Sequence, residues 1–94
     1  MSTLIIEEHR QKLIQELGYL AAREGGLSVS DFQAALNKAA TVFPGTTNGL
    51  RRYCADEFKV SPATVQRWLN GKSVPPATVR SVILVRLRQH LMGL

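Results

Sequence analysis

The sequence contains little of several features that would place a small chain in particular protein classes. A single cysteine, Cys54, among 94 residues excludes an internal disulfide framework and a cysteine-based zinc site. Apolar runs such as Val82–Val85 are far shorter than the roughly 20 residues that a membrane-spanning helix needs. The first residues reach Glu7 and Glu8 without the basic region and apolar run of a secretory signal. We therefore expect a cytoplasmic protein with no membrane partner.

Residues that would support catalysis or hold a metal are equally sparse. His9 and His90 are far apart in the sequence, and neither belongs to a metal-binding spacing. Asp56 and Glu57 are adjacent, so on a helix they point in different directions, unlike an acid–base pair that converges on a substrate. We interpret Cys54 as a small apolar group between helices rather than a nucleophile. We predict that the chain is not an enzyme and has no catalytic residue, metal or cofactor.

Acidic residues are absent from Lys59 to the C-terminus. Residues 1–47 contain four basic and five acidic residues, a net charge of −1, whereas residues 48–94 contain eight basic and two acidic residues, a net charge of +6. A long stretch without acids produces a positive potential that attracts polyanions, of which nucleic acid is the commonest. A surface that serves only solubility would usually mix both signs. The charge distribution therefore favours a nucleic-acid partner.

The spacing of apolar residues predicts an all-α fold of five helices in a single domain, residues 1–94. The expected helices are residues 3–24, 30–43, a short helix that is capped by one of residues 46–48 and ends at 58, residues 62–69, and residues 77–91. The predicted starts and stops rest on local signals. They are a capping box at Ser30 and Gln33, a serine cap with proline at Ser61-Pro62, and glycine stops at Gly25-Gly26 and Asn70-Gly71.

The most informative stretch is residues 51–70, RRYCADEFKVSPATVQRWLN. It contains a short helix, a break of about three residues and a second short helix. Two helices that cross closely need a small residue where they touch, and Ala55 stands at that place. We expect Val60 in the turn and Val65 in the second helix to point inward, and Trp68 to pack back against the first helix. These four positions make the interior of a helix-turn-helix.

This stretch, and above all SPATVQRWLNGKSVPP, resembles the helix-turn-helix of the phage repressor and Cro family, also called XRE-type. The resemblance covers residues 31–91 and implies a lambda-repressor-like domain. By that resemblance residues 51–58 cross the DNA backbone and residues 62–69 form the recognition helix. The helix within residues 1–26 has no obvious counterpart in the minimal fold, so we assign it an accessory or dimerisation role. The family usually has glycine where this chain has Lys59, so we expect either a strained left-handed residue or a more open turn.

A recognition helix lies in the major groove, where its N-terminal residues and outward face meet base edges. The expected base-reading residues are Ser61, Ala63, Thr64, Gln66 and Arg67. Gln66 can make a bidentate contact with adenine, and Arg67 can contact either guanine or a phosphate. The expected phosphate contacts are Arg51, Lys59, Asn70 and Lys72. Arg80 has two interpretations, a partly buried salt bridge with Glu57 or a DNA contact.

The resemblance implies a sequence-specific regulator of transcription, such as a repressor, that binds double-stranded DNA. One module makes few contacts, so we expect a homodimer on a pseudo-palindromic operator. The last helix, with apolar residues on two faces, and the N-terminal helix are both candidates for the dimer interface. The alternative is a protein-interaction or antitoxin-like adaptor whose N-terminal helix engages a protein partner, because helix-turn-helix folds also serve such roles.

Overall fold

The computed structural model describes residues 2–23 and 27–93, with side chains from residue 7 onward. Helices are the only regular secondary structure in these two ranges, and they number five. They are α1 (Ser2–Ala21), α2 (Val29–Val42), α3 (Thr46–Phe58), α4 (Pro62–Asn70) and α5 (Ala77–Met92). The predicted all-α class and number of helices are therefore confirmed. Within the described part of the chain, none of the helices is long and apolar enough to cross a membrane.

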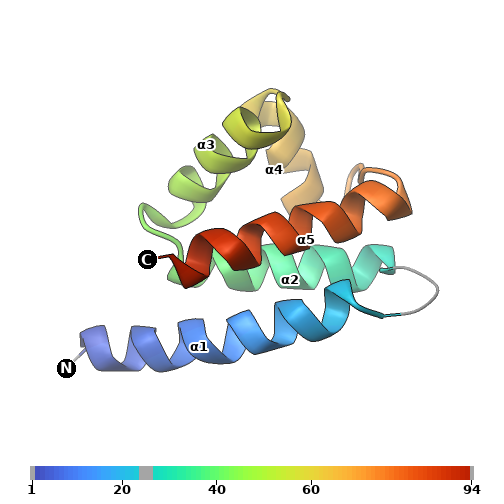
Figure 1. The fold of residues 1–94 in the computed structure, drawn as a ribbon. Helices are drawn as coiled ribbons and strands as arrows, with labels where there is room; N and C mark the ends of the chain where they lie inside the picture. Colours follow the sequence, from blue (N-terminus) through green and yellow to red (C-terminus); the bar gives the residue numbers. More distant parts are fainter. Residues whose placement is uncertain (1, 24–26, 94) are drawn as a thin grey trace.

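The helices form a lower group and an upper pair (Figure 1). Helices α1, α2 and α5 lie alongside one another, and α1 and α5 run in opposite directions. Helices α3 and α4 contact each other and lie above this group. Because α2 contacts all four other helices, it is the element against which both the lower group and the upper pair are positioned.

One hydrophobic core joins all five helices. The same buried cluster contains Leu17 of α1, Phe32 and Leu36 of α2, Leu50 of α3 and Ile83 of α5. These side chains are almost fully inaccessible to solvent. From residue 7 onward, α1 supplies four buried residues, Leu13, Ile14, Leu17 and Leu20, so this apolar face completes the core. Burial of such aliphatic side chains stabilises a small domain by about 1.5–3 kcal/mol each.

Helix α1 approaches α5 closely at Gly18. The Arg88 guanidinium of α5 lies over this glycine, and its Nε donates a hydrogen bond of 3.0 Å to the backbone oxygen of Ile14. A Cβ atom at Gly18 would lie 2.8 Å from that Nε, closer than atoms of this kind can approach. Gly18 weakens the intrinsic helix propensity of α1, but it creates the space for the side chain that ties α5 to α1.

The helix starts differ from the sequence prediction in two places. Helix α2 is capped by Ser28, whose hydroxyl accepts a hydrogen bond of 3.1 Å from the Asp31 amide. The predicted capping box at Ser30 and Gln33 is therefore wrong: Ser30 lies inside the first turn. Both serines satisfy the residue preference for a helix cap, so composition alone could not choose between them.

Helix α3 also begins earlier than its expected caps allow. Gly45, in the left-handed region with φ 82°, precedes the helix, and no side chain caps it. Residues 46–48, proposed as caps, instead form the first turn, so the connection from α2 is only residues 43–45. Helix α1 ends at Ala21 rather than at 24, and the stop predicted at Gly25-Gly26 lies outside the described residues.

Candidate nucleic-acid interface

The turn between α3 and α4 is built from a left-handed residue and a serine cap. Lys59 has φ 56° and ψ 46°, which is the first of the two geometries expected for a non-glycine residue at this place. The Val60 amide donates to the Ala55 oxygen at 3.1 Å and closes the end of α3. Ser61 then caps α4 by accepting from the Thr64 amide at 3.1 Å, with Pro62 at the first helical position. A left-handed L-residue costs about 1–2 kcal/mol, and the rest of the fold supplies that free energy.

The interior of this motif is apolar, as the spacing suggested. Val65 is fully buried, and Trp68 is buried with its ring edge-on to Phe32, the ring centroids 6.2 Å apart. Ala55 and Val60 are half-buried and pack against the same core. One side of α4 is therefore held by hydrophobic contacts with α2 and α3.

The C-terminal end of α4 is held by polar side chains of α2. The side-chain amides of Gln33 and Asn37 both donate to the backbone oxygen of Leu69, at 3.1 and 3.0 Å. Gly71 follows with φ 74° and donates its amide to the last turn of α4. A Cβ at Gly71 would lie 2.8 Å from the Gln33 Oε1. Local sequence patterns do not indicate this role of Gln33 and Asn37, because the contact spans more than 30 residues.

Opposite its buried side, α4 presents one continuous face. Ala63, Gln66, Arg67 and Asn70 are three or four positions apart, so they share this face of the helix. Ala63, Arg67 and Asn70 are exposed and Gln66 is half-buried. We call these four residues the outer face of α4. Thr64 lies beside it, and its hydroxyl is 2.9 Å from that of Ser61, so these two expected base-reading residues are engaged in the cap.

A chain of hydrogen bonds joins the outer face to α3. Arg51 donates from Nη1 to the Gln66 Oε1 at 3.1 Å, and from Nη2 to Asn48. Gln66 in turn donates from Nε2 to the Asn70 Oδ1 at 3.1 Å. We call Asn48, Arg51, Gln66 and Asn70 the amide network. Three of its members were expected to contact DNA independently, and the structure brings them into mutual contact.

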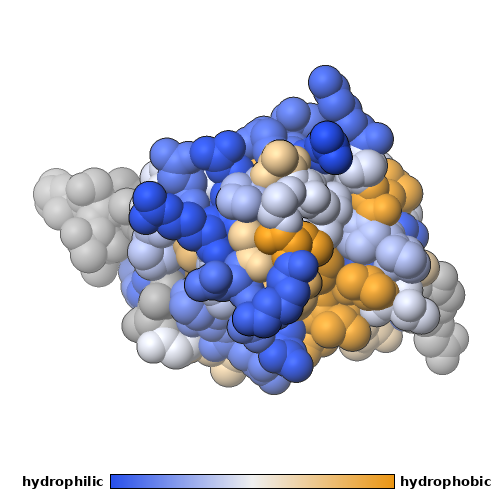
Figure 2. Space-filling model, turned by 90° about the horizontal axis from the view of Figure 1, so that it is seen from above, coloured by the Kyte–Doolittle hydropathy of each residue, from blue (hydrophilic) through white to orange (hydrophobic). Residues whose placement is uncertain are grey.

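Basic side chains surround this face. Lys59 precedes α4, Lys72 follows it, and both are exposed. The view from above, over α3 and α4, shows a largely hydrophilic surface with a hydrophobic patch beside it (Figure 2). On α3, Glu57 is neutralised by Arg86 at 2.7 Å. The surface around α4 therefore combines exposed cations with few free acids.

Arg80 contributes to the fold instead of to this surface. Its Nε donates to the Leu27 oxygen at 2.9 Å, and its Nη1 donates to the Pro75 oxygen at 2.7 Å. The expected salt bridge with Glu57 is wrong, because Glu57 pairs with Arg86. Arg80 thus fastens the start of α5 to the segment that precedes α2.

Cys54 and His90 lie in the interior of the α3 region. Cys54 is fully buried, and burial raises the pKa of its thiol to about 12, so the thiol stays protonated near neutral pH. His90 is stacked on Phe43 and lies against Tyr53, with ring centroids 5.2 and 4.4 Å apart. The Tyr53 hydroxyl donates to the Arg86 oxygen at 3.2 Å. These side chains join the ends of α2, α3 and α5 by packing.

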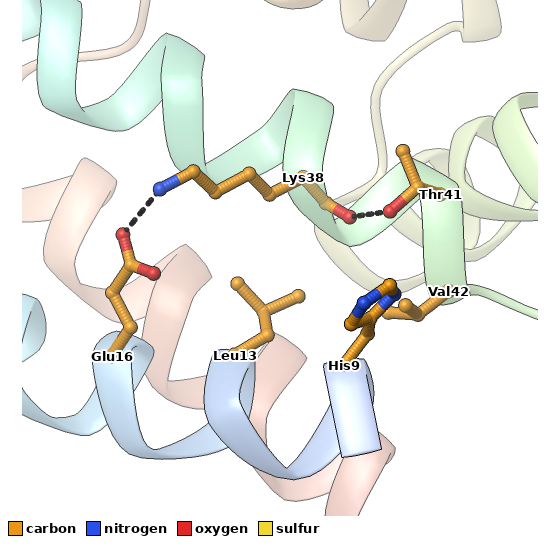
Figure 3. A pocket seen from close by; sticks show the side chains of 6 residues that line it. All are labelled: His9, Leu13, Glu16, Lys38, Thr41 and Val42. Carbon is orange, nitrogen blue, oxygen red and sulfur yellow. Dashed lines mark hydrogen bonds and ion pairs between the residues drawn. The ribbon is translucent and has the colours of Figure 1, made fainter. Parts of the chain in front are cut away.

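A shallow pocket of about 230 Å³ lies between α1 and α2 (Figure 3). Lys38 crosses one end of it and pairs with Glu16 at 2.9 Å. His9 and Val42 lie at the other end, with Leu13 between. Its charged groups pair with each other, and none of its lining residues belongs to α3 or α4. Across the described residues, no group of three or more His, Cys, Asp or Glu side chains is placed to hold a metal ion.

Comparisons with known proteins found no matching family model, no matching curated protein and no matching solved structure.

Proposed function

We propose that this protein is a sequence-specific regulator of transcription that binds double-stranded DNA, with α4 as the recognition helix. The observation that carries the proposal is the outer face of α4, three of whose four residues are polar. Helix α4 is held in place by its buried side and by hydrogen bonds from α2. The chain has no acidic residue after Glu57. An α-helix fits the major groove, and its outward side chains meet the base edges there.

The remaining contacts follow from the same placement. Arg67, exposed on the outer face, has the donors to contact guanine O6 and N7 or a phosphate. Lys59 and Lys72 are placed at the two ends of α4, where the phosphate backbone passes on either side of the groove. In this interpretation α2 to α5 form a lambda-repressor-like helix-turn-helix domain, and α1 is an additional helix that completes its core.

A single outer face makes too few contacts for a specific site at physiological salt, so we propose a homodimer on a pseudo-palindromic operator. Helix α5 offers a surface for the second copy. Val82, Val85 and Met92 are exposed, and they lie on the side of α5 opposite its buried residues. Burial of these three side chains against a second copy would remove apolar surface from water.

The adaptor alternative receives less support from α4. A protein-binding helix would more often present apolar anchors, whereas the outer face offers an amide, a guanidinium and a second amide at Gln66, Arg67 and Asn70. Such groups match the donors and acceptors of base edges. A stoichiometric protein partner bound with no DNA shift would instead favour the adaptor.

Selection of bound DNA from a random pool tests the regulator proposal. We expect an enriched inverted repeat with half-site centres about 10 base pairs apart, or a multiple of that spacing. Affinity for the enriched site should fall steeply with salt, and Arg67→Ala should weaken binding by about 1–3 kcal/mol if Arg67 reads a base. Binding with equal affinity to all sequences would overturn the regulator proposal and leave nonspecific DNA binding.

A further inference from the structure

The amide network places Arg51 in contact with Gln66, a residue of the outer face of α4. Arg51 comes from α3 and Gln66 from α4, fifteen positions later, and the Nη1 to Oε1 distance is 3.1 Å. The second guanidinium nitrogen, Nη2, donates to Asn48 of the same helix. Arg51 is half-buried. Its guanidinium is therefore fixed by two acceptors of its own chain.

These contacts determine which way the Gln66 side-chain amide is turned. A guanidinium has only donors, so it can face the amide oxygen but not the amide nitrogen. Asn70 receives the Nε2 hydrogen through its Oδ1 at 3.1 Å. Reversing the amide would set the Gln66 nitrogen against the Arg51 donors. The amide oxygen is therefore held toward α3 and the amide nitrogen toward the C-terminal end of α4.

Each atom of that amide keeps one unused hydrogen-bonding position. An amide oxygen accepts two hydrogen bonds and an amide nitrogen donates two, and the network uses one of each. One acceptor position on the Gln66 oxygen and one donor on its nitrogen are therefore left for a ligand. In the major groove adenine presents a donor at N6 next to an acceptor at N7, which this pair matches, whereas guanine presents two acceptors, O6 and N7. Guanine would set its O6 against the Gln66 oxygen.

We propose that Arg51 is a positioning residue that holds the Gln66 amide in one orientation and thereby makes this position of the interface select adenine over guanine. The inference rests on the proposed function, because it needs α4 to enter the major groove. It replaces the sequence-based assignment of Arg51 as a phosphate contact. Specificity at one base pair then depends on a residue of the helix that crosses the DNA backbone.

The test uses the full chain and the DNA site enriched by selection. The base pair that Gln66 contacts is the one whose sequence preference is lost in Gln66→Ala. Affinities are then compared for two sites that carry adenine or guanine at this base pair. Arg51→Met removes the donors and keeps the apolar stem. Arg51→Lys keeps a side chain that only donates hydrogen bonds and can therefore face the Gln66 oxygen but not its nitrogen. Arg67→Met is a matched control that removes an exposed guanidinium from α4 itself. Circular dichroism and thermal unfolding establish that each variant is folded.

We expect the wild type to prefer adenine at this position, and Arg51→Met to reduce the adenine-to-guanine affinity ratio about tenfold. Arg51→Lys should keep most of that ratio. Arg67→Met should weaken binding or change the preference at a different base pair, with the ratio at the Gln66 position unchanged. This separation distinguishes positioning from general loss of positive charge.

Two results would overturn the inference while leaving DNA recognition intact. One is an Arg51→Met protein that binds every sequence more weakly by the same factor, with the base ratio preserved and a shallower salt dependence, which would make Arg51 a phosphate contact. The other is a wild-type preference for a base other than adenine at the Gln66 position. Absence of any sequence preference in the wild type would overturn the proposed function itself.

Discussion

Lys59 shows how one residue can combine backbone strain with a proposed functional charge. It occupies the left-handed region, which glycine adopts at little energetic cost but which is unfavourable for lysine. Lys59 is exposed at the turn that precedes α4. This turn therefore carries a cation at a cost in backbone free energy.

Replacement of Lys59 should reveal this strain. Lys59→Gly is expected to raise the free energy of unfolding by about 0.5–1 kcal/mol, because relief of the left-handed penalty exceeds the entropy cost of glycine. Lys59→Ala removes the same charge but keeps the Cβ, and should give no such gain. Urea denaturation of the three proteins provides the measurement. Equal stabilities for the glycine and alanine variants would contradict the assignment of strain to this residue.

The buried thiol of Cys54 predicts a dependence of stability on alkaline pH. Its pKa is about 12 in the folded protein, raised from 9.0 by burial, so above pH 9 the unfolded chain loses a proton that the folded protein keeps. Stability from this group is complete below pH 9 and is lost between about pH 9 and 12. Between pH 8 and about 10.5, the wild type should lose about 2 kcal/mol more than Cys54→Ala.

The measurement is urea denaturation of both proteins across that range, under reducing conditions. The pKa of Tyr53 is raised by burial and by the neighbouring Glu57 and Cys54, so the comparison removes the part of the Tyr53 contribution that does not depend on the thiol. Parallel loss of stability in the wild type and in Cys54→Ala would show that the thiol is not desolvated in the folded protein.

Among the helices, α4 depends both on caps from its own flanking residues and on hydrogen bonds from α2. Helix α4 has nine residues, fewer than an isolated helix needs to persist in water. Its cap at Ser61, the left-handed Gly71 and the bonds from α2 to Leu69 satisfy backbone groups that a short helix leaves free. The order of the proposed recognition helix therefore depends on both ends being held.

Two alanine substitutions test which serine caps α2. Ser28→Ala removes the acceptor for the Asp31 amide and should lower the free energy of unfolding by about 1 kcal/mol. Ser30→Ala, two positions later and exposed, should change it by less than about 0.5 kcal/mol. Chemical denaturation of the two variants side by side gives the answer. A larger loss for Ser30→Ala would restore the capping box that the sequence suggested.

At the scale of the whole molecule, α1 is part of the core that supports the candidate interface. Its buried leucines pack with the residues of α2 and α5, and α2 in turn holds α4. The chain of contacts from α1 to α4 runs through a single hydrophobic cluster. We therefore expect the helix within residues 1–26 to be required for folding of the remaining chain, whatever part it takes in a dimer.

Truncation of one α1 residue tests this dependence. Leu17→Ala should cost about 2–5 kcal/mol, because the side chain is fully buried. Tyr19→Ala, on the same helix but with 74% of the residue exposed, should stay within about 0.5 kcal/mol of the wild type. Trp68 fluorescence during urea denaturation reports the upper helices. If Leu17→Ala alters helicity but leaves the Trp68 transition unchanged, α1 is an appendage rather than part of the domain.

Features that arise within one or two helical turns could be predicted from the amino-acid sequence alone. Five helices, the start of α4 at Ser61-Pro62 and its end near Gly71 follow from apolar spacing and backbone preference, which act locally. The choice of Ser28 over Ser30 was not determined, because both serines satisfy the same local preference.

Contacts between polar groups of different helices could not be predicted from local patterns. Arg51 bonds to Gln66, Gln33 to Leu69 and Arg80 to Leu27, across separations of 15, 36 and 53 residues. Such bonds depend on the angles at which helices cross and on which side chain reaches a free carbonyl, and no local preference encodes these. The residues of a helix determine which of its faces is apolar, because side chains three or four positions apart share a face. The hydrogen-bond partners of those side chains depend on which other helices pack against that face.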